Sequence, residues 1–159
     1  MSAEPQLAVV AEQTGESPPL VGIVMGSASD MDIMQGAARE LGERGIGHEV
    51  QVMSAHRQPD LVAEYAKGAR ARGLRVLIAG AGLSAALPGV LASHTDLPVI
   101  GVPLSSRLSA GGGLDAILSV IQMPPGVPVA AVGLDNARNA GVLAARIIDS
   151  GGAWPLSVA

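Results

Sequence analysis

The feature that most constrains the fold is a fivefold alternation between short apolar runs and segments with helical spacing. Residues 20–25 are almost wholly apolar and stop at Gly26, as expected for a strand buried on both faces of a parallel sheet. The apolar residues of the next segment share one helical stripe: Met31, Met34, Ala38 and Leu41. The alternation then predicts strands over 50–53, 75–78, 99–102 and 127–132, and helices over 59–72, 84–93, 114–122 and 136–149. The helix over 84–93 is expected to be interrupted, or to start late, at Pro88 and Gly89.

Five strand–helix units without an intervening linker predict an α/β fold in a single domain. The expected architecture has three layers, with helices on both faces of a doubly wound parallel sheet. We expect this domain to span residues 20–150, between a flexible N-terminal tail over 1–19 and a C-terminal tail over 151–159. Such sheets bind ligands outside the carboxyl ends of their strands, so polar residues at those ends are the candidate site.

The composition limits the partners that this chain can have. Hydrophobic residues make up 48% of the chain and charged residues only 15%, whereas an ordinary soluble domain has roughly 25% charged residues. No apolar run approaches the ~20 residues that span a bilayer, so we expect no membrane association and assign the apolar excess to contacts within a homo-oligomer. The net charge of -4, without a basic cluster, argues against nucleic acid.

Cysteine content and the first residues of the chain bear on its compartment. The chain has no cysteine, which excludes disulfides and thiol chemistry. Residues 1–19 are polar and lack the basic and then apolar segments of a signal peptide. We therefore expect a cytoplasmic protein.

A polar turn follows the first predicted strand. Gly26 lets a ligand approach the backbone closely, and the hydroxyls of Ser27 and Ser29, with the amides at a helix start, can hold an anion. Asp30 would repel phosphate but can accept hydrogen bonds from ribose hydroxyls. The alternative is an ordinary turn in which Ser29 or Asp30 caps the helix, and a capping residue can also contact a ligand.

A second polar turn follows the second predicted strand. Arg57 is suited to clamp a phosphate and Ser54 can add a hydroxyl, although an exposed surface side chain is the alternative for Arg57. His56, with an ordinary pKa of ~6.5, is suited to move protons in both directions near neutrality. We expect His48 and His94 to be structural or exposed, and three scattered histidines without cysteine or a carboxylate at ligand spacing predict no metal site.

Two glycine-rich segments follow the third and fourth predicted strands. Gly80 and Gly82 have no side chains and lie where the third strand is expected to end. One explanation is that a helix packs tightly against them, and the other is that a flat substrate ring lies on the bare backbone. Residues 111–113 are all glycine and follow the polar residues Ser105, Ser106 and Arg107. Their location predicts a lid over the ligand, although a flexible connection is the alternative.

Six blocks, in order between residues 21 and 148, closely resemble the N5-carboxyaminoimidazole ribonucleotide mutase family of purine biosynthesis. The blocks are 26–30, 54–57, 79–82 with 87–89, 101–103, 122–128 and 139–145. The resemblance implies a flavodoxin-like domain assembled as a homo-octamer. It also implies a reaction without metal, ATP, biotin or any other cofactor, in which a carboxyl group moves from the exocyclic nitrogen of a nucleotide substrate to a ring carbon.

The resemblance also assigns roles to residues of the two polar turns. It implies that His56 is the catalytic group and that Ser27, Asp30 and Arg57 bind the nucleotide. It places a further set in matching pocket segments: Ser29, Ser54, Gly80 and Gly82. Many family members have a histidine at the position of Ala86. A functional coupling to the ATP-dependent synthetase that makes the carbamate substrate is a further expectation.

Two alternatives remain open. The nearer is aminoimidazole ribonucleotide carboxylase, which uses free carbon dioxide and usually has a lysine at the position of Arg57. The more distant is a non-enzymatic flavodoxin-like module. A flavin carrier stacks its ring on aromatic residues, and this chain offers only Tyr65 and Trp154. A phospho-receiver needs an aspartate at the end of the third strand, where Ala79 and Gly80 lie instead.

Overall fold

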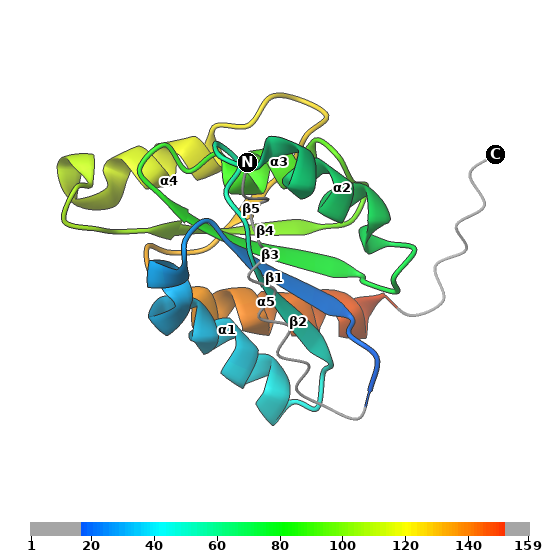
Figure 1. The fold of residues 1–159 in the computed structure, drawn as a ribbon. Coiled ribbons are helices and arrows are strands. Elements are labelled where there is room, and N and C mark those ends of the chain that lie inside the picture. The colour runs from blue at the N-terminus through cyan, green and yellow to red at the C-terminus, as the bar shows by residue number, and fades with distance from the viewer. Residues whose placement is uncertain (1–16, 152–159) are drawn as a thin grey trace, which may run out of the picture.

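The computed structural model describes residues 17–151, and the tails predicted over 1–19 and 151–159 fall almost entirely outside that range. Its centre is a five-stranded parallel sheet in the order β2-β1-β3-β4-β5 (Figure 1). The strands are β1 (Val21–Met25), β2 (His48–Val52), β3 (Val76–Gly82), β4 (Val99–Leu104) and β5 (Ala130–Ala131). This is the flavodoxin-like strand order, so the predicted fold class is confirmed.

Helices cover both faces of the sheet (Figure 1). One face carries α1 (Met31–Glu43) and α5 (Ala137–Ser150), and the other carries α2 (Pro59–Ala69), α3 (Leu87–Ala92) and α4 (Leu114–Ile121). Two short 3-10 helices, η1 (Ala28–Asp30) and η2 (Ala110–Gly113), precede α1 and α4. Each face has its own buried apolar cluster, around Met34 and Leu41 on the first and around Leu91 and Val120 on the second.

The ends of several elements differ from the prediction. β3 continues to Gly82 and β4 to Leu104, because these residues still pair with each other in the buried centre of the sheet. β5 has only two residues instead of six, both exposed at the edge of the sheet. α3 begins at Leu87 with Pro88 in its first turn, which agrees with the expected late start at Pro88 and Gly89, and Leu83 in the preceding turn has a left-handed φ of 55°.

A buried carboxylate links α1 to α5. Glu40 accepts hydrogen bonds from Arg138 of α5, at 2.9 Å, and from Arg44, which caps the C-terminus of α1, at 2.7 and 2.9 Å. Hydrogen bonds from Arg138 and then Arg44 hold the pKa of Glu40 below its usual value. The helices also approach closely at Gly141, where an added Cβ would lie 2.9 Å from the carbonyl oxygen of Ala37. The first turns of α5 are therefore firmly placed against α1.

No helix within residues 17–151 is both long enough and apolar enough to cross a bilayer.

Candidate active site

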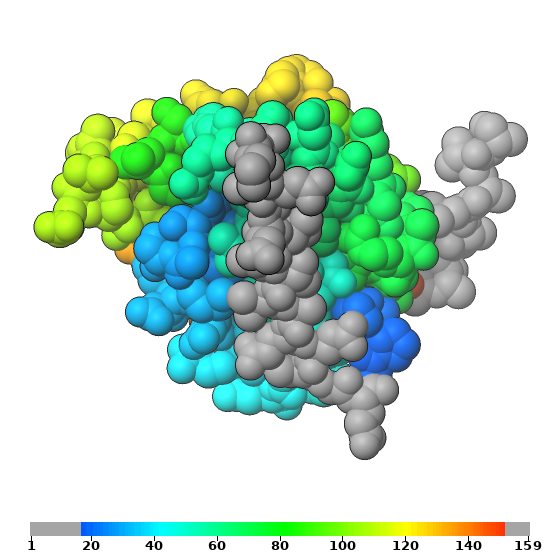
Figure 2. Space-filling view, viewed as in Figure 1, coloured from blue at the N-terminus to red at the C-terminus, as the bar shows by residue number. Residues whose placement is uncertain are grey.

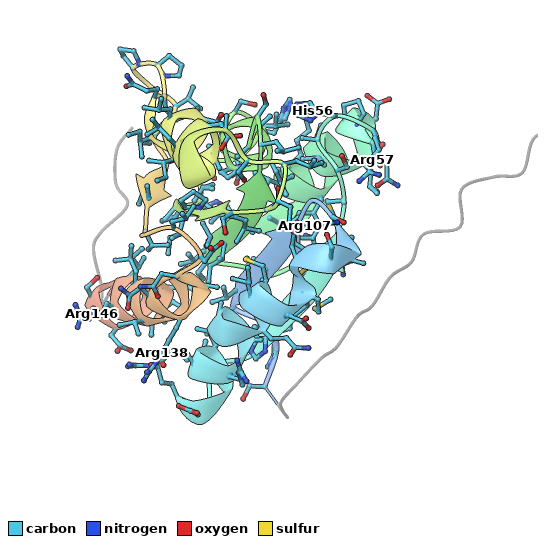
Figure 3. The ribbon with its side chains drawn as sticks, turned by 90° about the vertical axis from the view of Figure 1, so that its left-hand side faces the viewer. His56, Arg57, Arg107, Arg138 and Arg146 are labelled. Carbon is cyan, nitrogen blue, oxygen red and sulfur yellow. The ribbon has the colours of Figure 1, made fainter. Side chains whose placement is uncertain are left out.

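A cavity of about 320 Å³ lies at the carboxyl edge of the sheet. The segments that follow β1, β2, β3 and β4 all contribute to its wall, and the sheet reverses its strand order between β1 and β3. Figure 3 views the molecule toward this edge, with His56 and Arg57 on the segment between β2 and α2. Seven of the eight predicted site residues line the cavity: Ser27, Ser29, Asp30, Ser54, His56, Arg57 and Gly82.

The turn after β1 is held by its own serines. Ser27 caps η1 by accepting hydrogen bonds from the backbone N–H of Ser29, at 3.3 Å, and from its hydroxyl, at 2.9 Å. Asp30 occupies the N-cap position of α1, as one of our alternatives expected, but its side chain makes no capping hydrogen bond, and Ser27 caps the 3-10 turn that precedes α1. Burial raises the pKa of the Asp30 carboxyl, and hydrogen bonds from Ser27 and Ser29 partly oppose that change.

The turn after β2 is closed by Ser54 and joined to the first turn by Arg57. The Ser54 hydroxyl accepts a hydrogen bond from the backbone N–H of Arg57 at 3.3 Å, and its carbonyl accepts one from Gln58 at 2.8 Å. The guanidinium of Arg57 donates to the carbonyl of Gly26 at 3.2 Å. Arg57 therefore lies across both turns, next to the exposed imidazole of His56.

The two glycines of β3 have different surroundings. Gly82 lines the cavity, and an added Cβ there would lie 3.0 Å from the carbonyl oxygen of Leu104. Gly80 is buried in the strand and absent from the cavity wall, and an added Cβ would collide with Met34 of α1. For Gly80 the structure matches the packing alternative rather than contact with a ligand.

Several wall residues were missed by the sequence analysis. An apolar part of the wall comes from Leu83, Ala86, Leu87, Leu104 and Leu108. Leu108 is 80% exposed and Leu83 is 43% exposed, so both leave apolar surface at the mouth of the cavity. Ser105 and Ser106, which were expected at this edge as polar residues after the fourth strand, also line it, while Arg107 lies on the same edge of the molecule (Figure 3). No sequence pattern predicted that Leu83 lines the cavity, because a leucine gives no indication of a left-handed backbone.

The other histidines and the acidic residues that the structure describes form no metal site. His48 is buried, with its Nδ1 atom 3.0 Å from the carbonyl oxygen of Ile46, which agrees with the expected structural role. His94 follows α3 and is not part of the cavity wall. Within residues 17–151, no three His, Asp or Glu side chains are grouped so as to hold a metal ion.

The arrangement combines three chemical functions in one cavity. The Arg57 guanidinium and the serine hydroxyls of the first two turns can hold an anionic group. The imidazole of His56 can transfer protons beside it. The leucines and Gly82 offer an apolar, partly bare surface on which a flat ring can lie.

Comparisons with known proteins agree with this geometry. The family model described as AIR carboxylase matches residues 20–153. The N5-carboxyaminoimidazole ribonucleotide mutase of Pyrococcus horikoshii is 57% identical over 130 residues, which cover 82% of this chain and 72% of that protein. The chloroplastic phosphoribosylaminoimidazole carboxylase of Vigna aconitifolia is 48% identical over 153 residues, 92% of this chain but 27% of that longer protein. The crystal structure of Treponema denticola PurE superposes with a TM-score of 0.74 and 36% identity, over 84% of this chain and 82% of that one.

Proposed function

This chain belongs to the AIR carboxylase family, and we propose that it is an N5-carboxyaminoimidazole ribonucleotide mutase acting in purine biosynthesis. The enzyme moves a carboxyl group from the exocyclic nitrogen of its substrate to a ring carbon, giving 4-carboxy-5-aminoimidazole ribonucleotide. The observation that carries this proposal is the position of His56, which shares one cavity wall with Arg57 and with the serines of the turn after β1.

The first two turns bind the ribose phosphate. Arg57 and the hydroxyl of Ser27, whose own hydrogen is free because Ser27 accepts from Ser29, offer donors to the phosphate, and Ser29 holds the Ser27 hydroxyl in place. Asp30 accepts hydrogen bonds from the ribose hydroxyls. Ser54 shapes the second turn and adds a hydroxyl to the wall.

His56 carries out both proton transfers of the reaction. Its imidazolium first protonates the carbamate nitrogen, so that the nitrogen–carbon bond breaks and carbon dioxide is released inside the cavity. The electron-rich ring carbon then attacks the carbon dioxide and forms the new carbon–carbon bond. The imidazole, now neutral, removes the proton from that ring carbon and restores the aromatic ring, so that a single group serves as acid and then as base.

The reaction requires that carbon dioxide be retained and water excluded. The segment after β4, residues 105–113, projects from the body of the molecule beside α1 (lime, at the left of Figure 2). Its Leu108 and the Leu83 side chain from the turn after β3 both border the cavity. Closure of this segment would bring apolar side chains over the substrate and limit the freedom of the intermediate.

The carboxylase named for the Vigna relative is the second candidate, and a substrate test separates the two. We expect the purified protein to convert N5-carboxyaminoimidazole ribonucleotide rapidly, as measured by the absorbance of the product. We expect aminoimidazole ribonucleotide with bicarbonate to react only slowly, because nothing then delivers carbon dioxide to the closed cavity. Efficient use of only the second substrate pair would show that the protein is a carboxylase.

Assembly into a homo-octamer and a cytoplasmic location are further parts of the proposal, as is coupling to the synthetase that makes the carbamate. The support for assembly is an apolar stripe on α4, where Leu114, Leu118 and Ile121 are 51%, 45% and 48% exposed at helical spacing. The exposed two-residue edge strand β5 lies next to this part of the fold. A second copy of this chain would cover surface that a charge-poor monomer leaves in water.

A charge placed in the α4 stripe tests the assembly. We expect the wild-type protein to have the mass of an oligomer by light scattering, and Leu118→Asp to give smaller species, because a carboxylate would lose its hydration in the interface. Lys67→Glu, a charge change on the exposed face of α2, is the control and should keep the wild-type mass. A monomeric wild-type protein, or an unchanged mass for Leu118→Asp, would contradict this interface.

A further inference from the structure

The turn between β5 and α5 holds an aspartate in a backbone conformation that L-residues rarely adopt. Asp135 has a φ of 56° and is, with Leu83, one of two non-glycine residues with positive φ among residues 17–151. A left-handed backbone is unfavourable for an ordinary residue and less so for aspartate. Such strain persists only where surrounding contacts enforce it, and it concentrates at functional sites. The contacts of Asp135 must therefore hold it in this conformation.

Those contacts all join Asp135 to the end of β4. Its backbone N–H donates to the carbonyl of Pro103 at 2.9 Å. Its carboxylate accepts two hydrogen bonds from one residue, from the backbone N–H of Ser105 at 2.8 Å and from the Ser105 hydroxyl at 2.5 Å. Hydrogen bonds to a carboxylate are stronger than those between neutral groups. Asp135 thus fixes both the backbone and the side chain of Ser105.

The second of these bonds determines what Ser105 can offer to a ligand. A hydroxyl group has one hydrogen to donate and two lone pairs that accept. The hydrogen of the Ser105 hydroxyl is directed to Asp135, and Ser105 itself lines the cavity. Only the lone pairs remain available to the ligand, so toward the cavity Ser105 acts as an acceptor.

The strand order separates Ser105 from the phosphate-binding turns. Ser105 follows β4, whereas Arg57 follows β2, and the ends of β1 and β3 lie between them. The negative charge of Asp135 behind Ser105 also disfavours a phosphate at that side of the cavity. The group that contacts Ser105 is therefore a hydrogen-bond donor and not an anion, and it lies at the opposite end of the substrate from the phosphate.

We infer that Asp135 is a positioning residue that turns Ser105 into a hydrogen-bond acceptor for the exocyclic amine of the aminoimidazole ring. This inference rests on the proposed function, which supplies the ligand. Two hydrogen bonds in series, from the amine to Ser105 and from Ser105 to Asp135, orient the heterocycle relative to His56 once Arg57 has bound the phosphate. The carboxylate does not touch the substrate and acts through Ser105.

The surrounding structure keeps this turn in place. Asn136 caps α5 by accepting a hydrogen bond from the N–H of Asn139 at 3.1 Å, and Arg138 in the same turn of helix pairs with Glu40 of α1. The neighbouring Leu134 packs at the other end of the 105–113 segment, where a Cβ added to Gly113 would lie 2.8 Å from a Leu134 methyl group. Leu134 and Asp135 together contact both ends of the segment that borders the cavity.

A double-mutant cycle tests the inference with four proteins: wild type, Asp135→Asn, Ser105→Ala and the double variant. Asparagine also tolerates a left-handed backbone, but its amide can donate to the Ser105 hydroxyl and release the hydroxyl hydrogen toward the cavity. We expect Asp135→Asn to weaken binding of aminoimidazole ribonucleotide about tenfold by calorimetry, which is the size of one lost hydrogen bond. In the Ser105→Ala background the same replacement should change binding less than twofold, because Asp135 then has nothing to orient.

Ribose 5-phosphate identifies the donor group, since it carries the sugar hydroxyls and the phosphate but no amine. Its affinity should be the same for wild type and Asp135→Asn, and an equal loss for both ligands would overturn the assignment to the amine. Asp135→Gly separates stability from recognition, because glycine adopts the left-handed backbone freely but has no acceptor. It should stay folded with a Tm only modestly below that of wild type, because two hydrogen bonds to Ser105 are lost, and it should lose binding as Asp135→Asn does. Asp149→Asn, at the exposed far end of α5, is the charge-matched control and should change neither.

If Asp135→Asn lowered the affinity equally in the wild-type and Ser105→Ala backgrounds, Asp135 would act through the fold and the inference would be overturned. Unchanged binding in Asp135→Asn would also overturn it. The proposed reaction is tested apart from this. A wild-type protein that binds aminoimidazole ribonucleotide and shows the coupling, yet fails to convert the carbamate, would remove the proposed reaction and leave the role of Asp135 intact.

Discussion

Replacement of His56 with asparagine is expected to abolish turnover of the carbamate while the fold and nucleotide binding remain. Asparagine is close to histidine in size and keeps a polar tip in the cavity wall, but it can neither give nor take a proton at neutral pH. General acid–base catalysis contributes about 10²–10⁴-fold to one step, and in the proposed mechanism His56 serves two steps. We expect kcat to fall by at least about 10³-fold. Calorimetry with aminoimidazole ribonucleotide should give an affinity within a factor of about three of wild type, well under the effect of one lost hydrogen bond.

His94→Asn is the matched control, because His94 follows α3 and does not line the cavity. It should keep both kcat and affinity. Since His56 is exposed in a surface turn, the Tm of His56→Asn should be close to that of wild type. Near wild-type kcat for His56→Asn would refute the assignment of His56 as the proton carrier, whatever the binding data show.

The convergence of the polar turns was predictable because it follows from topology alone. Parallel strands place their carboxyl ends along one edge, so the residues that follow four apolar runs must gather there. Ser27, His56 and Gly82 come from three different strand ends and line one cavity. The sequence also contained the cues for the helices, such as Pro59 at the first position of α2.

Gly80 shows where local reasoning about glycine fails. Two glycines in four residues indicate a turn as readily as a strand interior, and only the packing of α1 decides between them. In the folded chain Met34 lies where a side chain of Gly80 would be, so the glycine serves the core. Gly82, two residues further along β3, lines the cavity instead.

Asp135 was not predictable, because its role depends on a contact between segments that lie far apart in the sequence. Nothing around Asp135 in the sequence distinguishes it from an ordinary residue before a helix. Its partner Ser105 was noted only as a polar residue after the fourth strand. The direction of the hydrogen bond between Ser105 and Asp135 is seen only when β4 and the turn after β5 are placed together. This bond uses the hydrogen of the Ser105 hydroxyl, so a serine that could donate or accept can only accept from a ligand.

Replacement of Arg57 with alanine is expected to weaken nucleotide binding by about 10- to 100-fold in calorimetry, the range for hydrogen bonds to a charged group. Arg57 supplies a guanidinium to the cavity wall and also joins the second turn to the carbonyl of Gly26 at 3.2 Å. Loss of the guanidinium removes the positive charge that faces the phosphate and releases the first turn from the second. The affinity of ribose 5-phosphate should fall by a similar factor, because this ligand contains the phosphate that we propose Arg57 binds.

Two further variants separate charge from geometry. Arg57→Lys keeps the charge but loses the planar fork, so it should bind with an affinity between those of wild type and Arg57→Ala. Arg146→Ala removes an exposed arginine of α5, far from the cavity in Figure 3, and should bind as wild type does. An unchanged affinity in Arg57→Ala would contradict the phosphate clamp. If added salt did not reduce the loss of affinity in Arg57→Ala, that loss would instead be assigned to the broken link between the two turns. Salt weakens interactions between exposed charges but does not affect a neutral rearrangement in this way.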